Sequence, residues 1–192
     1  LGFVIGGSAP EGEVSVSQAA AEHLFGVVLF NDWSARDIQG FEYVPLGPYL
    51  GKSFASSISL WVVPWEALET ARVSPPEREH ALADYLDEGG QDWALDITME
   101  VELDGEVVSH PPCRAMYWTA PQMVAHMTVN GASLRPGDFF GSGTVSGDER
   151  DQRGSFMELS WGGKEPLVLA DGRGGTFRWS MTGAAVLFFV TA

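Results

Sequence analysis

The sequence predicts a mostly β fold of the α+β class with few short helices, and three observations carry that prediction. Apolar and polar side chains alternate over residues 95–103, which is the pattern of a strand with one buried face. Asp104-Gly105 follows directly and is typical of a tight hairpin turn into a second strand at 106–109. Short apolar runs separated by Gly, Pro and Asn recur along the chain, whereas few segments have helical spacing.

The remaining elements follow from local patterns. Thr119 and Gln122 match a capping box, and an apolar helical face at Met123, Val124 and Met127 ends before Asn130-Gly131. Further helices are predicted at 18–24 and, after Pro64, at 65–70. Buried or half-buried strands are predicted at 27–30, 58–63, 157–161 and 166–169.

Composition narrows the classes of partner. The 192 residues include 26 acidic and 11 basic side chains, so the summed field repels phosphate backbones and anionic lipid headgroups. We therefore expect no nucleic-acid partner and no membrane partner. An anionic substrate would need local cations or a metal to reverse that field. The single Cys113 cannot form an internal disulfide, which favours a cytoplasmic location.

The densest polar segment lies between Asn31 and Tyr43, directly after an apolar run. Asp32 at a strand end is a hard oxygen donor suited to calcium or magnesium, and Arg36 and Gln39 would follow it one and two turns along a helix. The alternative is that Asp32 only caps that helix and pairs with Arg36, while Gln39 is solvated. Residue types alone favour the cap.

Two glycine-rich segments are weaker candidates. Residues 45–54 end in Gly51-Lys52-Ser53, which could cradle an anion or could be a turn with a solvated lysine. Residues 141–147 offer backbone N–H groups and the Thr144 hydroxyl, with Glu158 on a strand that follows, or form a plain turn. None of the four histidines has zinc spacing, and Cys113 has no base nearby in sequence.

Taken together, these strings resemble a known family. Phe-Asn-Asp-Trp-Ser-Ala-Arg-Asp-Ile-Gln (30–39), Glu-Tyr-Val-Pro-Leu-Gly-Pro-Tyr-Leu-Gly-Lys-Ser-Phe (42–54), Met-Tyr-Trp-Thr (116–119), Leu-Arg-Pro-Gly-Asp (134–138), Ser-Gly-Thr-Val-Ser-Gly (142–147) and Met-Glu-Leu-Ser-Trp (157–161) occur in the order of the fumarylacetoacetate hydrolase family. The string at 42–48 is typical of its fumarylacetoacetase branch. The resemblance covers about residues 1–177 and implies a mixed β-roll or sandwich.

The resemblance implies metal-dependent hydrolysis of a carbon–carbon bond in a 1,3-diketo acid, giving fumarate and acetoacetate in the last step of tyrosine breakdown. It makes Asp32 a ligand of calcium or magnesium, with Lys52 and Ser56 at the edge of the metal. Arg36, Gln39 and Lys52 would stabilise the leaving group. Substrate would contact Gln39, Tyr43 and Thr144, and Glu158 would orient a general-base histidine. The family also implies a homodimer.

Two departures from the family pattern shape the expectation for this chain. The base histidine and three further carboxylate ligands of the family precede Leu1, so we expect residues 1–192 to be a partial catalytic domain that lacks its start and is inactive alone. Residues 178–192 form an atypical tail, either a diverged strand or the product of a shifted reading frame. Ser56 stands where the family has Thr and keeps the hydroxyl.

The sequence leaves two other functions open. One is another hydrolase or decarboxylase of the superfamily, such as an acylpyruvate-type enzyme, against which Tyr43 and the following Val-Pro-Leu-Gly-Pro argue. The other is a non-catalytic β-rich remnant, which the missing ligands and the tail favour.

Overall fold

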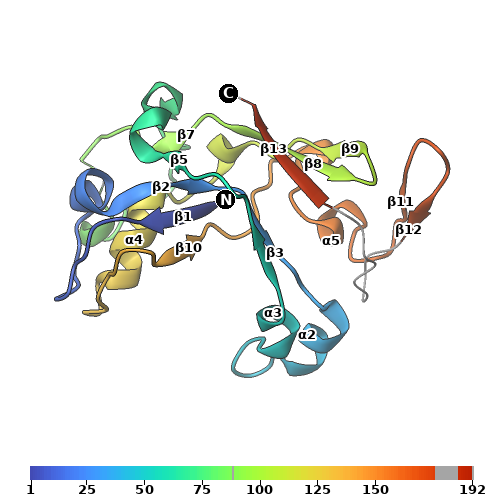
Figure 1. Cartoon of the computed structure of the whole chain (residues 1–192), viewed down its shortest axis with the longest axis horizontal. Helices are drawn as coiled ribbons and strands as arrows, with labels where there is room; N and C mark the ends of the chain where they lie inside the picture. Colours follow the sequence, from blue (N-terminus) through green and yellow to red (C-terminus); the bar gives the residue numbers. More distant parts are fainter. Residues whose placement is uncertain (88, 176–185, 192) are drawn as a thin grey trace.

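The computed structural model describes residues 1–87, 89–175 and 186–191, and it confirms the α+β class (Figure 1). Short strands arranged in several sheets dominate, and the helices are few and short. Of the predicted tail, residues 178–185 and 192 lie outside the described residues, while Val186–Thr191 form strand β13. None of the helices in the described ranges has the length and apolar character that a membrane crossing requires.

The main sheet is antiparallel and has the strand order β10-β1-β2-β5. Phe3 of β1 lies opposite Val27 of β2 and Phe140 of β10, so the first strand of the chain is central. The chain leaves the sheet after β2 and returns to it as β5, the direct neighbour of β2. The strands of this sheet are β1 (Gly2–Ile5), β2 (Leu24–Val28), β5 (Val63–Pro64) and β10 (Phe139–Gly141).

Helices pack against this sheet around a core cluster that joins Phe3 and Ile5 of β1 to Val124. Helix α4 (Ala120–Thr128) starts with the predicted capping box and contacts the helical turns α1 (Val16–Gln18) and η1 (Ala19–His23). Val124 is fully buried there, but Met127 is half exposed, so the predicted apolar face is wrong at Met127. The buried face of α4 includes the amide of Gln122 instead, whose Nε2 donates a hydrogen bond to the Leu86 carbonyl at 2.8 Å.

The predicted alternating strand is confirmed with one interruption. It forms β7 (Ala94–Leu95) and β8 (Thr98–Leu103), and every second side chain from Leu95 to Leu103 is buried. Asp104 and Gly105 both have positive φ, 52° and 86°, as the predicted hairpin turn requires, and lead into β9 (Glu106–Ser109). Strand β8 pairs with β9 on one side and with β13 on the other.

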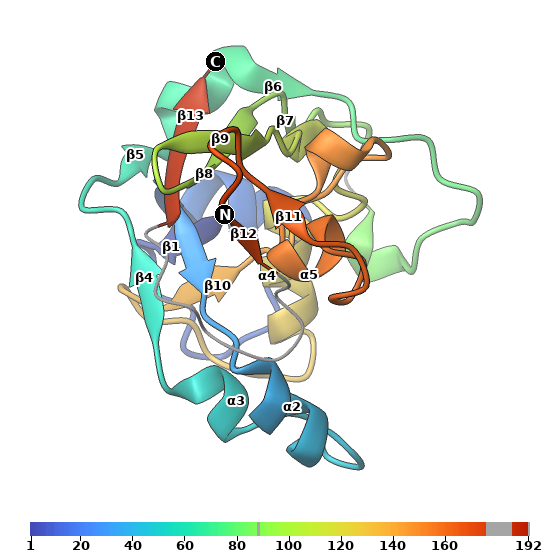
Figure 2. The ribbon, with the colours of Figure 1, turned by 90° about the vertical axis from the view of Figure 1, so that its right-hand side faces the viewer.

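Between β2 and β5 the chain forms a projecting unit, called the arm (residues 29–62), which hangs away from the main sheet in Figures 1 and 2. Its base is a two-stranded ribbon of β3 (Phe30–Asp32) and β4 (Ser56–Ile58), and its end holds α2 (Arg36–Glu42) and α3 (Leu50–Ser53). The strand predicted at 58–63 is wrong, because residues 59–62 lie in neither β4 nor β5 and Leu60 is 94% exposed.

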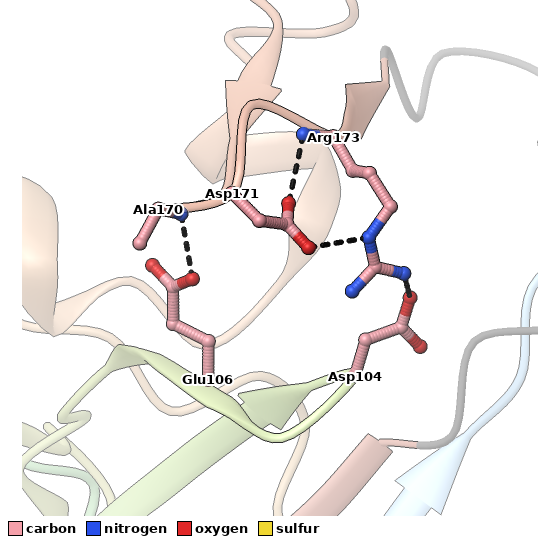
Figure 3. Close-up of polar contacts among 5 residues, drawn as sticks. All are labelled: Asp104, Glu106, Ala170, Asp171 and Arg173. Atoms are coloured by element: carbon pink, nitrogen blue, oxygen red, sulfur yellow. Dashed lines mark hydrogen bonds and ion pairs between the residues drawn. The ribbon is translucent and has the colours of Figure 1, made fainter.

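Two short ribbons complete the described strands: β6 (Arg72–Val73) with β7, and β11 (Leu167–Val168) with β12 (Gly174–Gly175). The turn before β12 is fastened to the β8–β9 hairpin, as Figure 3 shows. Arg173 donates to Asp104 and to Asp171 at 2.8 and 2.6 Å, and the Glu106 carboxylate accepts from the Ala170 N–H at 2.7 Å. These exposed contacts fix the orientation of the ribbon more than they stabilise it.

The remaining helices include one correction. The helix predicted at 65–70 is confirmed as a 3-10 helix, η2. The strand predicted at 157–161 is wrong, because residues 156–159 form helix α5, whose N-cap Ser155 accepts a hydrogen bond from the Glu158 N–H. These helices are η2 (Trp65–Ala71), η3 (Asp84–Leu86), η4 (Cys113–Ala115), η5 (Arg150–Gln152) and α5 (Phe156–Leu159).

Truncation of Ile5 to alanine should test the placement of the core. Ile5 is 1% exposed within the core cluster, so Ile5→Ala should lower the free energy of unfolding by about 2–5 kcal/mol in urea denaturation. Leu60→Ala is the matched control, and because Leu60 is exposed its effect should stay within about 0.5 kcal/mol. A large loss from Leu60→Ala would mean that the segment before β5 is buried after all.

Candidate functional site

A cavity of about 450 Å³ lies where the base of the arm meets the segments 141–145 and 154–157. Its apolar wall includes Phe30, Met99 and Phe156. The polar residues that line it include Asp32, Ser34, Arg36, Lys52, Thr144 and Ser155. Four of the predicted site residues, Asp32, Arg36, Lys52 and Thr144, therefore share one cavity although they come from distant parts of the chain.

Within the arm, Lys52 of α3 and Asp32 at the end of β3 form an ion pair. The Lys52 Nζ also donates to the Ser34 hydroxyl at 2.9 Å. Both side chains remain partly exposed, 29% for Lys52 and 40% for Asp32, so the pair contributes little to stability but fixes an ammonium at the cavity wall. Lys52 is thus not the solvated turn lysine of the alternative prediction.

Helix α2 presents the second cation. The Arg36 Nη1 donates to the Gln39 Oε1 at 2.8 Å, which joins two predicted site residues on one helical face. Partial burial lowers the pKa of the Arg36 guanidinium, and the charges of Asp32 and Glu158 oppose that shift. The guanidinium stays protonated, because its ordinary pKa lies far above neutrality.

The alternative that Asp32 caps α2 is wrong. The N-cap of α2 is Ala35, which makes no side-chain capping bond, and the carboxylate of Asp32 pairs with Lys52 instead. Asp32 therefore lies at the end of β3, as the sequence predicted, and is paired with a cation from α3.

Close backbone packing holds the two helices of the arm together. Gly51 is buried against α2, and a Cβ at that position would lie 2.7 Å from the Gln39 backbone nitrogen. The Ala35 N–H also donates to the Gly51 carbonyl at 2.8 Å. Glycine is required here by close approach, and that approach brings Lys52, the next residue, beside the start of α2.

Glu158 comes to the site from helix α5, not from a strand as predicted. Its carboxylate accepts from the Ser146 hydroxyl at 3.0 Å and from the Ser155 hydroxyl at 2.7 Å. The Gly154 N–H in turn donates to the Ser146 hydroxyl at 3.1 Å. Glu158 lines a second hollow of about 480 Å³ that shares Met157 with the main cavity. Ser146 belongs to the candidate segment 141–147, whereas Ser155 is a site residue that the sequence patterns did not indicate.

Besides Glu158, three predicted site residues do not line the main cavity in the described part of the chain. Gln39 contacts it through Arg36, while Tyr43 ends α2 and is 55% exposed. Ser56 lies opposite Asp32 in the β3–β4 ribbon. The structure thus brings Ser56 beside Asp32 and leaves Tyr43 on the outer part of the arm.

The described residues do not form a complete metal site. Calcium takes six to eight oxygen ligands, and magnesium takes six. No group of three or more His, Cys, Asp or Glu able to hold an ion occurs among the described residues, and Asp32 is already paired with Lys52. Likewise, no histidine is among the described residues that line the main cavity.

Two histidines and the cysteine, which do not line the cavity, have structural roles. His23 and His126 lie on helices as predicted, with His23 buried beside the Gly7 carbonyl and His126 bonded to the Tyr85 hydroxyl. Cys113 is 4% exposed, and burial raises the pKa of its thiol to about 11. A thiol in that state is a poor nucleophile.

Comparison with known proteins gives the chain a family. Residues 1–173 match the family described as fumarylacetoacetate (FAA) hydrolase C-terminal. The chain belongs to the fumarylacetoacetate hydrolase family. The human fumarylacetoacetase is 45% identical over 179 residues, which cover 90% of this chain and 42% of the human protein. The Emericella nidulans fumarylacetoacetase is 50% identical over 161 residues, covering 80% of this chain and 37% of that protein. The chain therefore spans less than half the length of these curated relatives.

Solved structures of the fumarylacetoacetate hydrolase family share the fold. A putative HpcE protein from Mycobacterium smegmatis has a TM-score of 0.61 at 20% identity, with 99% of this chain and 52% of that chain covered. Fumarylpyruvate hydrolase from Pseudomonas aeruginosa, solved with Mn²⁺ and pyruvate, has a TM-score of 0.52 at 19% identity, with coverages of 73% and 50%. Both likenesses concern the fold alone.

The buried thiol gives a direct test of this part of the structure. At pH 8, Cys113 in the folded chain should react with a disulfide reagent at least about 100-fold more slowly than in the urea-unfolded chain. Burial raises the pKa of the Cys113 thiol in the folded state, so folding favours the protonated thiol. The stability that depends on this protonated thiol is fully present below pH 9 and is lost as the pH rises through about 11. Equal rates in both states would contradict the burial of Cys113.

Proposed function

We propose that this chain carries part of the catalytic domain of a fumarylacetoacetase, which hydrolyses the carbon–carbon bond of fumarylacetoacetate to fumarate and acetoacetate. The observation that carries the proposal is the meeting of Arg36 and Lys52 at one cavity in a chain of net charge −15. The chain is 45–50% identical to fumarylacetoacetases from animals, a plant and a fungus. This identity supports fumarylacetoacetate as the substrate over the substrates of other family members.

The two cations suit the leaving group of this reaction. Cleavage between two carbonyl groups expels a carbanion that is stabilised as an enolate, so negative charge develops on an oxygen. An ammonium and a guanidinium that are already in place in a partly apolar cavity would stabilise this negative charge as it develops. Gln39, bonded to Arg36, would orient the guanidinium and contact the substrate.

The other predicted roles fit the geometry to different degrees. Thr144 lines the cavity and is placed to contact substrate, whereas Tyr43 would have to do so from the rim of the arm. Glu158 is held by two serine hydroxyls, which suits a carboxylate that orients a base. The base itself, which the family resemblance expects to be a histidine, would come from residues other than the described ones that line the cavity.

For the metal, we propose that Asp32 supplies one ligand to a calcium or magnesium site, with Lys52 and Ser56 at its edge. The Mn²⁺ in the related fumarylpyruvate hydrolase supports a divalent ion. A complete site needs more oxygen donors than the described residues bring together. We also propose a homodimer located in the cytoplasm, as the resemblance and the single buried thiol suggest.

A hybrid enzyme tests the proposed function. Residues 1–173 of this chain replace the matching segment of human fumarylacetoacetase, and loss of diketone absorbance is followed with fumarylacetoacetate and with an acylpyruvate. We expect the hybrid to hydrolyse fumarylacetoacetate and residues 1–192 alone to show no turnover. A folded hybrid that prefers the acylpyruvate, or that is inactive on both, would refute the assignment.

In this hybrid, removal of either cation should slow the reaction. Arg36→Met and Lys52→Met should each lower kcat by about 100- to 1,000-fold, the usual effect of losing one donor to a developing oxyanion. Arg114→Met is the control, because Arg114 pairs with Asp96 away from the cavity and its loss should leave kcat unchanged. Unaltered kcat in Arg36→Met or Lys52→Met would exclude a role in leaving-group stabilisation.

Metal binding should differ between the hybrid and the chain by itself. Calorimetry should show that residues 1–192 bind Ca²⁺ or Mg²⁺ with a Kd weaker than about 1 mM, because one carboxylate does not form a cage. The hybrid should bind more tightly and lose that gain in Asp32→Asn. Micromolar binding by the chain alone would show that its own residues complete a site.

A further inference from the structure

Glu42, at the end of α2, has a contact pattern that the proposed function does not use. Its carboxylate accepts hydrogen bonds from three successive backbone N–H groups at the start of α3. The Oε1 accepts from Tyr49 at 2.8 Å and from Gly51 at 2.6 Å, and the Oε2 accepts from Leu50 at 3.1 Å. The first turn of a helix has no internal partners for these N–H groups, so Glu42 supplies them from another helix.

From these contacts we infer that Glu42 is a positioning residue that fixes Lys52, and thereby the arrangement of the two cations, Lys52 and Arg36, at the cavity. The ammonium-bearing residue directly follows the last of the three N–H donors. The same four-residue helix packs through Gly51 on the backbone of Gln39, three residues before Glu42. Both contacts thus join α3 to α2 within Tyr49–Gly51, directly before Lys52 in the chain.

The carboxylate is the group that this arrangement needs. Bonds from Gly51, Tyr49 and Leu50 lower the pKa of Glu42, so it is ionised at neutral pH and presents acceptors on both oxygens. A glutamine would keep one acceptor and turn an NH2 donor toward the Leu50 N–H.

Asp37 provides a contrast on the same helix. It carries the same charge and is exposed, and its Oδ1 accepts a hydrogen bond from the neighbouring Ile38 N–H at 2.9 Å, its one bond within the described part of the chain. Removing Asp37 therefore changes the net charge of the arm as removing Glu42 does, but leaves the α2–α3 contact intact. Comparing the two substitutions therefore separates the loss of the α2–α3 contact from a general change in the electrostatic potential at Lys52.

Lysine acetylation provides a test that needs no enzyme activity. The chain has two lysines, Lys52 in its ion pair and the exposed Lys164, which serves as an internal reference. With a water-soluble acetylating reagent and peptide mass spectrometry, Glu42→Ala should raise the ratio of Lys52 to Lys164 labelling about three- to tenfold. Glu42→Gln should lie between Glu42→Ala and the unchanged chain, and Asp37→Ala should leave the ratio as it is. An unchanged ratio in folded Glu42→Ala would overturn the inference.

A second measurement uses the unaltered chain and covers the case in which Glu42→Ala does not fold. On acidification, the amide proton resonances of Tyr49, Leu50 and Gly51 should shift together with one midpoint below the usual range of glutamate. No common titration of these three resonances would overturn the inference as well.

The effect on turnover rests on the proposed function and is measured separately. In the hybrid enzyme, Glu42→Ala should lower kcat more than it changes KM, Glu42→Gln should restore part of the loss, and Asp37→Ala should do neither. If the unaltered hybrid is inactive while the labelling and amide results hold, the proposed function fails and the positioning role stands. If the hybrid is active and Glu42→Ala leaves both kcat and the labelling ratio unchanged, the positioning role fails alone.

Discussion

The adjacency of β2 and β5 in the main sheet is the constraint on which the cation-bearing part of the cavity depends. Because these two strands are antiparallel neighbours, the chain between them must leave and re-enter the sheet at the same end of the strands. The β3–β4 ribbon satisfies this by running out and back as a pair, which sets Asp32 on one limb opposite Ser56 on the other. The structure of the arm is therefore held by hydrogen bonds between its own strands and helices.

Charge compensation explains how an acidic chain keeps two cations at one cavity. Lys52 is paired with Asp32, and Arg36 lies in the field of both Asp32 and Glu158. Each cation thus has a nearby carboxylate that offsets the cost of partial burial. Glu158 is itself held by neutral donors, the hydroxyls of Ser146 and Ser155. The acidic composition implied that an anionic substrate needs local cations, and these cations each lie near a carboxylate rather than in a basic patch.

The sequence predicts this structure well where the signal is local. The alternation at 95–103, the Asp104-Gly105 turn and the capping box at Thr119 each depend on residues within one element, and each is confirmed. The strand predicted at 58–63 failed because apolar residues there serve an exposed ribbon and its return to the sheet. Apolar residues recur from Met157 to Trp161 in a pattern that is typical of a strand, but the Ser155 hydroxyl caps the backbone at Glu158 and starts helix α5 there. The bonds from Glu42 to α3 have no such signal, since they join residues seven to nine positions apart through a loop.

The burial of Cys113 has a practical consequence for spectroscopy on this protein. It is the single cysteine of the chain and is 4% exposed, so a cysteine introduced on the surface would be the one readily reactive thiol. Leu46, 79% exposed near the outer end of the arm, is a suitable position for such a change, written Leu46→Cys. A fluorophore or spin label attached there would report the local environment and mobility of the outer end of the arm, without prior removal of the native thiol.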